Sequence, residues 1–516
     1  MYQNSRARTS RRQFLQLAVM VGVTASGVSA CSAGTSKQGG GTLRVAFGGT
    51  RGGAFNLDPA GPNRLYEALS ALYGYVVVLD EKHQPHPDLV TDWSVSKDAT
   101  QWSFKVRSNV EFHDGHPLTS SDIAYTLKRV LDPETGSAGA SLLAPSLTPS
   151  GISTPDTRTL RLDLKAPNSN LAATLASYQF GIIREGTGTD IAKTGIGTGP
   201  FRLKEFPPGG TVVLSRSDSY RKGPARLDEL HFTPIADAGA RVNALLAGQV
   251  ELLYSDSLAP ADLARVAADP ECRVVRAPSG TWDVIVMNCA AKPFSDVRVR
   301  QAFKAVVDQK QILDVVLSGK GGVADNNPVA LGDPLRASTP SIRDIPKAKR
   351  LLAEAGYPNG IDVTLHVAPY TETFLPLAQA YQQQAAEAGI RVKLQQHSAD
   401  NYVAETFGKA DFYVDYWGPR PAAQALNEVF LTGSANNETH WSNSTFDDAL
   451  SQARATTDIA RQKTLYAQAQ RTLADDGGAI IPVFEDISRA ARKNVANFPG
   501  KNQPDARPDY HTLGLA

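Results

Sequence analysis

Cys31 is the residue whose neighbours point most directly to a covalent reaction. It follows Val28, Ser29 and Ala30, and small residues before a cysteine resemble the processing site of a bacterial lipoprotein signal. The apolar run from Leu17 to about Ala25 is shorter than the roughly 20 residues that a membrane-spanning helix needs. We therefore expect cleavage before Cys31 and lipidation of its thiol; a secreted chain with a chance cysteine is the alternative.

An arginine pair predicts the export route. Arg11 and Arg12 stand shortly before the apolar run, which is typical of a twin-arginine signal. We predict that residues 1–30 are the signal peptide and that residues 31–40, which are small, polar and rich in glycine, form a flexible tether. Acyl chains contribute about 0.8 kcal/mol per buried methylene, so we expect an extracytoplasmic, membrane-anchored lipoprotein on the cell surface or the periplasmic side.

Length and charge limit the function classes. The 516 residues carry 53 basic and 52 acidic side chains, and this balance predicts no nucleic-acid-binding surface. No segment after the signal is long and apolar enough to span a membrane. A chain of this length exceeds what one hydrophobic core supports, which indicates two or three domains.

The other two cysteines, Cys272 and Cys289, lie in segments that alternate like strands. If Gly280 and Thr281 form a two-residue hairpin turn, these cysteines stand opposite each other. Opposed Cβ atoms are about 4.5–5.5 Å apart, which is near the range for a disulfide. In an oxidising compartment this predicts a bond between Cys272 and Cys289. Two free, buried thiols are the other interpretation, and the sequence leaves both open.

The sequence lacks the motifs of the common enzyme classes. It contains no Gly-x-Ser-x-Gly elbow, no phosphate-binding P-loop, no His-Glu-x-x-His and no dinucleotide fingerprint. His113 and His116 have the spacing of a metal pair, but no cysteine or further histidine lies near them. We predict no enzyme activity, no cofactor and no metal. Catalytic residues also converge from distant loops, so a secreted hydrolase is kept as an alternative.

Apolar periodicity predicts the elements that position such residues. Residues 41–47 and 390–394 alternate and are predicted as strands. Residues 297–317 and 374–388 carry apolar side chains at helical spacing and are predicted as helices. The alternation of helices and strands in the later half indicates an α/β fold.

Six short motifs follow one another along the chain. They are Pro87–Val95, Asp98–Arg107, Val110–Asp122, Gly197–Phe201, Ala244–Gln249 and Asn288–Val307. With these motifs the chain resembles the solute-binding protein family 5, the peptide-, nickel- and glutathione-type binding proteins of ABC importers. The resemblance covers residues 41 to about 499, nearly everything after the tether.

The resemblance implies a two-lobed α/β fold of the periplasmic-binding-protein type (type II, large cluster, with an inserted third subdomain). Residues 41–279 would form lobe I, with the insertion at about 75–194. Residues 280–479 would form lobe II, and residues 480–516 would return to lobe I. A solute would bind between the lobes and favour their closure, and the closed form would meet the permease and ATPase subunits of the importer. We expect a monomer.

The ligand is predicted from one departure from the family pattern. Peptide-binding members carry Trp-x-x-Asp-Tyr-Pro in the cleft, and its Asp pairs with the ammonium of the peptide. Here Trp417 matches, but Arg420 stands in place of the Asp. Either another acid such as Asp415 binds the amine, or the ligand is not a free-amine peptide. Arginine suits a carboxylate or phosphate; the alternative is that Arg420 faces solvent or pairs with an acid such as Glu428.

Several other residues are candidates for the cleft because aromatic rings stack on flat or cationic groups, although each fits a core position as well. They are Tyr416, Trp282, Tyr370 and Trp441, with Phe55 and Arg51 in the glycine-rich loop that follows the first strand. We predict a peptide or peptide-like ligand. A nickel chelate, glutathione or an oligosaccharide is the alternative.

Overall fold

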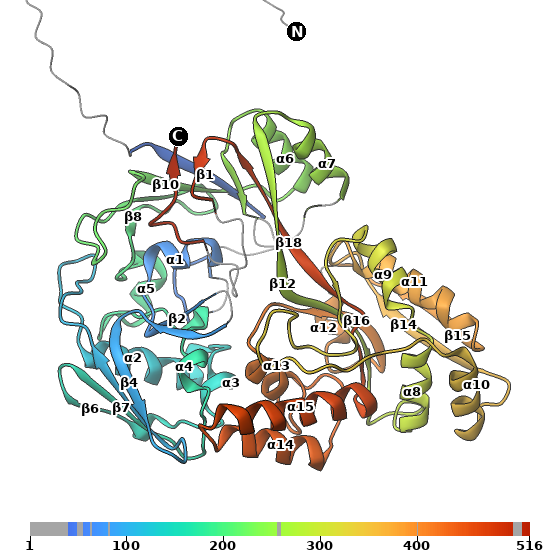
Figure 1. The fold of residues 1–516 in the computed structure, drawn as a ribbon. Helices are drawn as coiled ribbons and strands as arrows, with labels where there is room; N and C mark the ends of the chain where they lie inside the picture. Colours follow the sequence, from blue (N-terminus) through green and yellow to red (C-terminus); the bar gives the residue numbers. More distant parts are fainter. Residues whose placement is uncertain are drawn as a thin grey trace, which may run out of the picture. The chain divides into compact units, whose positions relative to one another are not determined.

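Two long neighbouring strands, β12 (Cys272–Met287) and β18 (Val483–Arg492), form the centre of the computed structural model (Figure 1). The structure describes residues 40–48, 55–61, 64–80, 83–254, 258, 260–399, 401–498 and 508–516. The signal, the tether, Cys31 and Arg51 lie outside these residues. β12 and β18 run antiparallel from the pair Cys272–Arg492 to Pro278–Asp486, and the register shifts before Trp282 meets Phe484.

The pair belongs to a twelve-stranded sheet in the order β15-β14-β16-β12-β18-β11-β1-β10-β9-β8, with β13 and β17 attached at the side. On one side of the pair lie β11 (Leu252–Tyr254), β1 (Thr42–Phe47), β10 (Glu229–Pro234), β9 (Val212–Arg216) and β8 (Phe201–Glu205). On the other side lie β16 (Phe412–Trp417), β14 (Ile361–Val367) and β15 (Ile390–Gln396), with β13 (Gly322–Val323) and β17 (Ala479–Ile480). Residues Gly39–Ala516 form one compact unit.

The hydrophobic cores divide this unit into two parts, which we call lobe I and lobe II. The cores of lobe I contain buried residues 43–272 together with 490–513, and those of lobe II contain residues 282–484. The chain therefore passes between the lobes along β12 and again along β18. The boundaries drawn from the sequence remain predictions.

Lobe I includes a separate core near its start. This core lies around a four-stranded sheet, β4-β5-β7-β6, and extends from Ala60 to Ile182. The strands are β4 (Val90–Val95), β5 (Gln101–Val106), β6 (Ile152–Asp156) and β7 (Thr159–Asp163), with the hairpin β2 (Val77–Leu79) and β3 (Pro85–Pro87) beside them. The helices of lobe I are α1 (Leu69–Leu72), α2 (Ser120–Leu131), α3 (Ala140–Leu143), α4 (Leu171–Thr174), α5 (Ile191–Thr194), α6 (Ala238–Leu246) and α7 (Pro260–Ala268). Two short strands, β19 (Val495–Ala496) and β20 (Gly514–Leu515), pair near the C-terminus.

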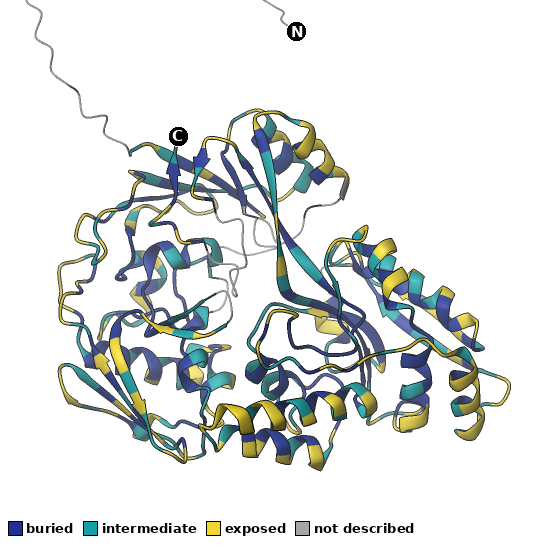
Figure 2. Ribbon diagram, in the orientation of Figure 1, coloured by how far each residue is buried: buried dark blue, intermediate teal, exposed yellow. Residues whose placement is uncertain are grey.

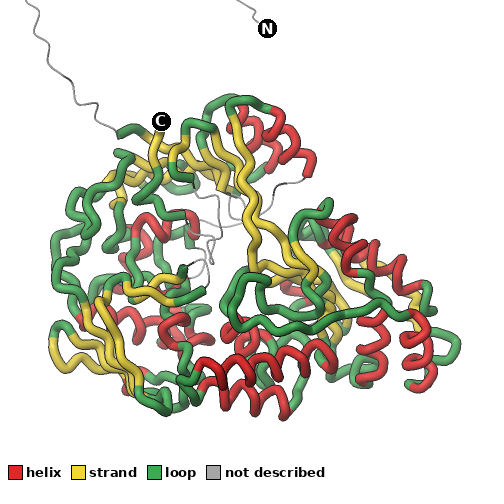
Figure 3. The backbone as a smooth tube through the Cα atoms, in the orientation of Figure 1, coloured by secondary structure: helices red, strands yellow, loops and turns green. Residues whose placement is uncertain are grey.

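In lobe II both faces of the sheet are covered by helices (Figures 1 and 3). The side chains of Ile285 and Met287 enter one core and those of Val284 and Val286 enter the other, as successive residues of a strand must. This explains the unbroken apolar run in β12, which Figure 2 shows as buried. The helices are α8 (Val297–Ala305), α9 (Gln309–Leu317), α10 (Ile345–Glu354), α11 (Phe374–Ala386), α12 (Tyr402–Thr406), α13 (Ala422–Val429), α14 (Ser444–Arg454) and α15 (Ile459–Asp476).

The strand and helix predictions are largely confirmed. Residues 41–47 and 390–394 lie in β1 and β15, and residues 374–388 contain α11. The stretch 297–317 is two helices instead of one. Asp308 begins the second, because its side chain accepts a hydrogen bond from the Gln311 backbone N–H at 2.9 Å.

The predicted hairpin at Gly280 and Thr281 is wrong, and with it the proposed disulfide. Both residues lie inside the single strand β12, so Cys272 begins the strand and Cys289 lies just beyond its far end. Both thiols are free. Gly280 is needed for close packing and not for a turn, because a Cβ there would lie 3.2 Å from Pro419 Cα.

Among the residues that the structure describes, no helix is long and apolar enough to cross a membrane.

Candidate functional site

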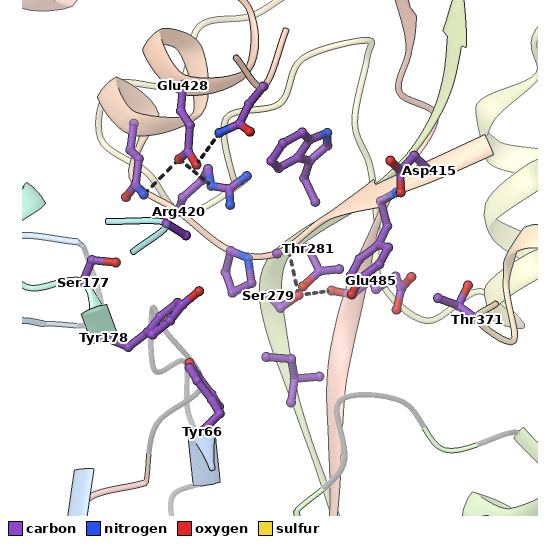
Figure 4. Close-up of a pocket in the computed structure, with 18 of the residues that line it drawn as sticks. Tyr66, Ser177, Tyr178, Ser279, Thr281, Thr371, Asp415, Arg420, Glu428 and Glu485 are labelled. Carbon is purple, nitrogen blue, oxygen red and sulfur yellow. Dashed lines mark hydrogen bonds and ion pairs between the residues drawn. The ribbon is translucent and has the colours of Figure 1, made fainter. Parts of the chain in front are cut away.

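A cavity of about 1110 Å³ lies between the two lobes. Lobe I contributes Tyr66 and Tyr178, and lobe II contributes Arg420 (Figure 4). Tyr370 and Trp417 of lobe II also line the cavity. The tyrosines of lobe I come from two short helical turns, Tyr66–Ala68 and Tyr178–Phe180, and their ring centroids are 5.1 Å apart. The cavity is therefore walled by aromatic rings from segments that are distant in the sequence.

The segment that follows β16 carries the central residues of the cavity. Pro419 and Pro421 end the strand, because proline cannot donate the hydrogen bonds that a sheet needs. Pro421 then precedes α13, whose first backbone N–H, that of Ala422, donates to Asp333 Oδ2 at 2.9 Å. This short connection places both Trp417 and Arg420 at the cavity.

Trp417 is held from behind by a buried acid. Its indole Nε1 donates to Glu438 Oε1 at 2.6 Å, and the Tyr413 hydroxyl donates to Glu438 Oε2 at 2.8 Å. Burial and the neighbouring Asp415 raise the pKa of Glu438. These bonds fix the plane of the Trp417 ring, so the ring forms a firm surface at the cavity wall.

Arg420 lies over that surface. Its guanidinium carbon is 4.7 Å from the centroid of the Trp417 ring and 5.8 Å from that of Trp282, which are cation–π distances. Its Nε is 3.6 Å from Glu428 Oε2, so the predicted alternative of an ion pair with Glu428 is present while Arg420 also lines the cavity. Burial lowers the pKa of Arg420.

Glu428 is fixed by neighbouring amides. The side chains of Gln424 and Asn436 each donate to it at 3.1 Å. The 3.6 Å separation from Arg420 exceeds a hydrogen-bond length, and both Nε and Nη1 of Arg420 are buried without a hydrogen-bond partner. Arg420 therefore keeps donors that the protein itself does not satisfy.

Acidic residues also line the cavity across β12, the strand that carries Thr281, from Arg420 (Figure 4). Asp415 and Glu485 both line the cavity. Burial raises the pKa of Asp415 to about 6 and, together with Glu485, raises the pKa of the fully buried Asp283. The Thr373 hydroxyl is 3.2 Å from Asp283 Oδ1 and 3.5 Å from Glu485 Oε1, so it donates within this group.

The structure brings four of the predicted ligand residues to the cavity: Trp417, Tyr416, Arg420 and Tyr370. Trp282 is fully buried and reaches the site only through its contact with Arg420.

Two predicted ligand residues, Trp441 and Phe55, lie in hydrophobic cores and do not line the cavity. Trp441 is 2% exposed, and its Nε1 donates to Asp476 Oδ2 at 2.9 Å. Phe55 is 7% exposed and packs on Phe47 with ring centroids 5.6 Å apart. Both follow the common tendency of large aromatic residues to fill cores. Arg51 is outside the described residues.

The sequence did not reveal several residues of the site. Tyr66, Tyr178, Glu438 and Glu485 had no motif or spacing that marked them, because tertiary contacts alone bring them to Trp417 and Asp415. The histidines considered as a metal pair have other contacts: His113 Nε2 is 3.1 Å from the carbonyl oxygen of Gly199. In the described residues, no group of three or more metal-ligating side chains is present.

Comparison with known proteins gives one consistent family. The family model for bacterial extracellular solute-binding proteins, family 5 (middle), matches residues 84–438. The glutathione-binding protein GsiB of Pectobacterium atrosepticum is 28% identical over 428 residues, which cover 80% of this chain and 82% of that protein. The dipeptide-binding protein DppE of Bacillus subtilis is 26% identical over 470 residues and 83% of each chain.

Solved structures agree with this result. The binding protein AgaA in complex with agropinic acid, from A. tumefaciens R10, is 26% identical with a TM-score of 0.77, covering 92% of this chain and 99% of that chain. The substrate-binding protein CtaP of Listeria monocytogenes shares the fold with a TM-score of 0.80 at 20% identity, over 92% of this chain and 99% of that chain.

Proposed function

Since this chain belongs to family 5 of the bacterial extracellular solute-binding proteins and is the solute-binding component of an ABC importer, we propose that it binds a peptide or peptide-like solute in the cavity between its lobes. The family consists of binding proteins that work outside the cytoplasm with permease and ATPase subunits. We propose that this chain likewise acts by binding alone, as a monomer.

The observation that supports this proposal is the chemistry of the cavity wall. Aromatic rings, two arginines and several carboxylates line a volume of about 1110 Å³, which is slightly larger than the roughly 300–1,000 Å³ of small-molecule sites. A short peptide combines apolar side chains with opposite charges, so it matches such a wall. The named ligands of similar proteins, glutathione, dipeptides and agropinic acid, also favour a small solute with charged groups.

The mechanism follows from the division of the wall between lobes. Tyr66 and Tyr178 belong to lobe I, whereas Trp417 and Tyr370 belong to lobe II. A solute that contacts all four rings gains its full binding free energy only when the lobes are together. It therefore binds the closed state more tightly than the open state and shifts the population toward closure.

We further propose that residues 1–30 direct export by the twin-arginine route and that the Cys31 thiol carries the lipid that holds the protein at the membrane. The motif Arg11-Arg12 and the small residues before Cys31 support this proposal.

Calorimetry tests the proposed solute class. Protein purified without refolding is titrated with dipeptides, tripeptides and glutathione, and native mass spectrometry identifies any solute that it retains. Trp417→Ala should weaken binding by about 1–3 kcal/mol, the scale for losing a buried aromatic contact. Trp93→Ala is the matched control, because Trp93 lies on β4 and does not line the cavity. Heat from an oligosaccharide or a nickel chelate, with none from any peptide, would reject the peptide proposal.

A further inference from the structure

Arg420 has hydrogen-bonding capacity that the protein leaves unused. Two of its three guanidinium nitrogens, Nε and Nη1, are buried and have no hydrogen-bond partner. Its nearest carboxylate oxygen, Glu428 Oε2, is 3.6 Å away from Nε. A buried donor without an acceptor costs free energy, and an acceptor that arrives with a solute removes that cost. Arg420 also lines the cavity with its side chain 16% exposed, so a solute can approach the guanidinium from the cavity side.

The surroundings keep the guanidinium in place for this contact. Trp417 lies under it at 4.7 Å, and the indole is itself anchored to Glu438. Glu428 cannot turn freely toward Arg420, since Gln424 and Asn436 donate to its carboxylate. A planar fork held in this way is suited to a planar carboxylate, which accepts two parallel hydrogen bonds.

The rest of the described wall disfavours an anion. The other basic residue of the described lining is Arg241, whose Nη1 donates to the carbonyl oxygens of Ile235 and Ala236 at 2.7 and 2.9 Å. Its Nε, in contrast to both Nε and Nη1 of Arg420, is the one guanidinium nitrogen of Arg241 that is buried without a hydrogen-bond partner. The acidic residues of the lining are more numerous: Glu67, Glu372, Asp415, Glu428, Glu485 and Asp486. A negatively charged group of a solute would be repelled along most of this wall, and Arg420, with two unpartnered nitrogens, is the arginine with more free donors to attract it.

We propose that Arg420 binds a carboxylate of the solute and so fixes its direction in the cavity, with the carboxylate over Trp417 and a positively charged group toward Asp415 and Glu485. The inference rests on the proposed function and adds the polarity of the bound solute to it. Arg420 is then a specificity residue that selects solutes with a free carboxylate and rejects their neutral derivatives.

The test is a thermodynamic cycle in which one change is made in the protein and the other in the solute. Wild-type protein and Arg420→Gln are titrated with the same tripeptide in its free-acid and C-amidated forms. Amidation should weaken binding to the wild type roughly 10- to 100-fold, the range for losing a hydrogen bond to a charged group. Arg420→Gln should weaken binding of the free acid to a similar degree and should no longer distinguish the two forms. A second pair of tripeptides, one N-acetylated and one with a free amine, should bind the wild type with different affinities. Asp415→Asn should bind the two with equal affinity.

Two controls keep the result interpretable. Arg350→Gln removes an exposed arginine of α10 that does not line the cavity, and it should bind like wild type. Amidation changes only the solute, so the wild-type comparison stands even where Arg420→Gln does not fold. Equal affinity of wild type for the acid and the amide would overturn the inference, as would a full amidation penalty in folded Arg420→Gln.

A separate measurement distinguishes this inference from the proposed function. If no peptide binds, the peptide proposal fails, and mass spectrometry of the solute retained on purified protein decides the role of Arg420. A retained solute with a carboxylate, present on wild type and Arg350→Gln and lost from Arg420→Gln, would support the inference. A solute without a carboxylate, for example one with only a phosphate or only neutral groups, would overturn it.

Discussion

At the scale of single residues, the site combines two arginines with carboxyl groups, and burial disfavours the ionised form of some of these carboxyl groups. Asp415 is the clearest case, because it lines the cavity and its pKa is raised from 3.8 to about 6, chiefly by burial. Its titratable neighbours Glu438 and Asp283 are both acids, and burial raises the pKa of each. Ionisation of Asp415 therefore lowers the stability of the folded protein when no cation lies beside it.

This cost predicts a dependence of stability on pH. Between pH 4 and pH 6 the folded protein holds the Asp415 proton while the unfolded chain releases it, so the contribution of this group to the free energy of unfolding falls as the pH rises. Asp415→Asn removes the titration. The stability of the variant relative to wild type should therefore rise by about 2 kcal/mol from pH 4 to pH 7.

Denaturant unfolding of wild type and variant at several pH values measures this difference. Asp314→Asn is the control, because Asp314 is exposed on α9. A stability difference that stays constant over this pH range would show that Asp415 is not the group responsible.

How far the sequence predicts the site depends on what each residue signals. Trp417 and Arg420 are predictable because they stand in a segment that resembles a family motif, and the structure places both at the cavity. Trp441 and Phe55 are predicted only from their aromatic character, which does not separate a cavity wall from a core. Glu438 was missed because its role depends on the indole N–H of Trp417, a contact that no local pattern encodes.

At the scale of elements, β12 shows where local signals mislead. Pro278, Gly280 and Thr281 look like turn residues, yet the chain continues straight through them as one strand. These residues mark an irregularity of the strand and not a turn, because the pairing of β12 with β18 changes register between Pro278 and Trp282. Proline and glycine mark the interruption of the ladder at the passage between the lobes. Strand and helix positions with clear periodicity, such as β1 and α11, were predictable because burial of one face determines them.

The loop before α4 joins the lobes away from the cavity. The Ser169 backbone N–H donates to the carbonyl oxygen of Arg454 at 2.9 Å, and Asn170 Nδ2 donates to the Tyr466 hydroxyl at 2.7 Å. Gln462 Nε2 donates to the Ser169 hydroxyl at 2.8 Å. These bonds link lobe I to α14 and α15, so they stabilise the arrangement in which both lobes face the solute.

Asn170→Ala should therefore weaken solute binding without touching the cavity. Loss of one hydrogen bond costs about 0.5–1.5 kcal/mol, which corresponds to a roughly 2- to 12-fold weaker affinity. Calorimetry measures the affinity, and small-angle scattering of the solute-free protein should show a larger radius of gyration. Asn359→Ala, at an exposed position of lobe II, should change neither value. Unchanged affinity and radius in Asn170→Ala would mean that this contact does not influence closure.

At the scale of the whole molecule, the expected tether and anchor determine where the binding unit works. The described residues contain no helix able to cross a membrane, and Cys31 is the residue proposed to carry lipid. Cys31→Ala should move the protein from the membrane fraction to the soluble fraction, because a single covalent site would hold the lipid. Fractionation and immunoblotting measure the distribution, and membrane retention of the variant would contradict lipid anchoring.

Replacing Arg11 and Arg12 by lysine is the matched change for export, and it should leave the protein in the cytoplasm.

The position of β18 has a consequence for how the molecule is made. Its residues pair with β12 on one edge and with β11 on the other, and Ala491, Val495, Tyr510 and Leu513 bury in the same core as Leu43 and Val45. Lobe I therefore needs both ends of the chain before its sheet is complete. While the ribosome still holds the last segment, β11 and β12 present unpaired edges that another chain can join. Aggregation during synthesis is the hazard of this topology, and the final part of the chain removes it.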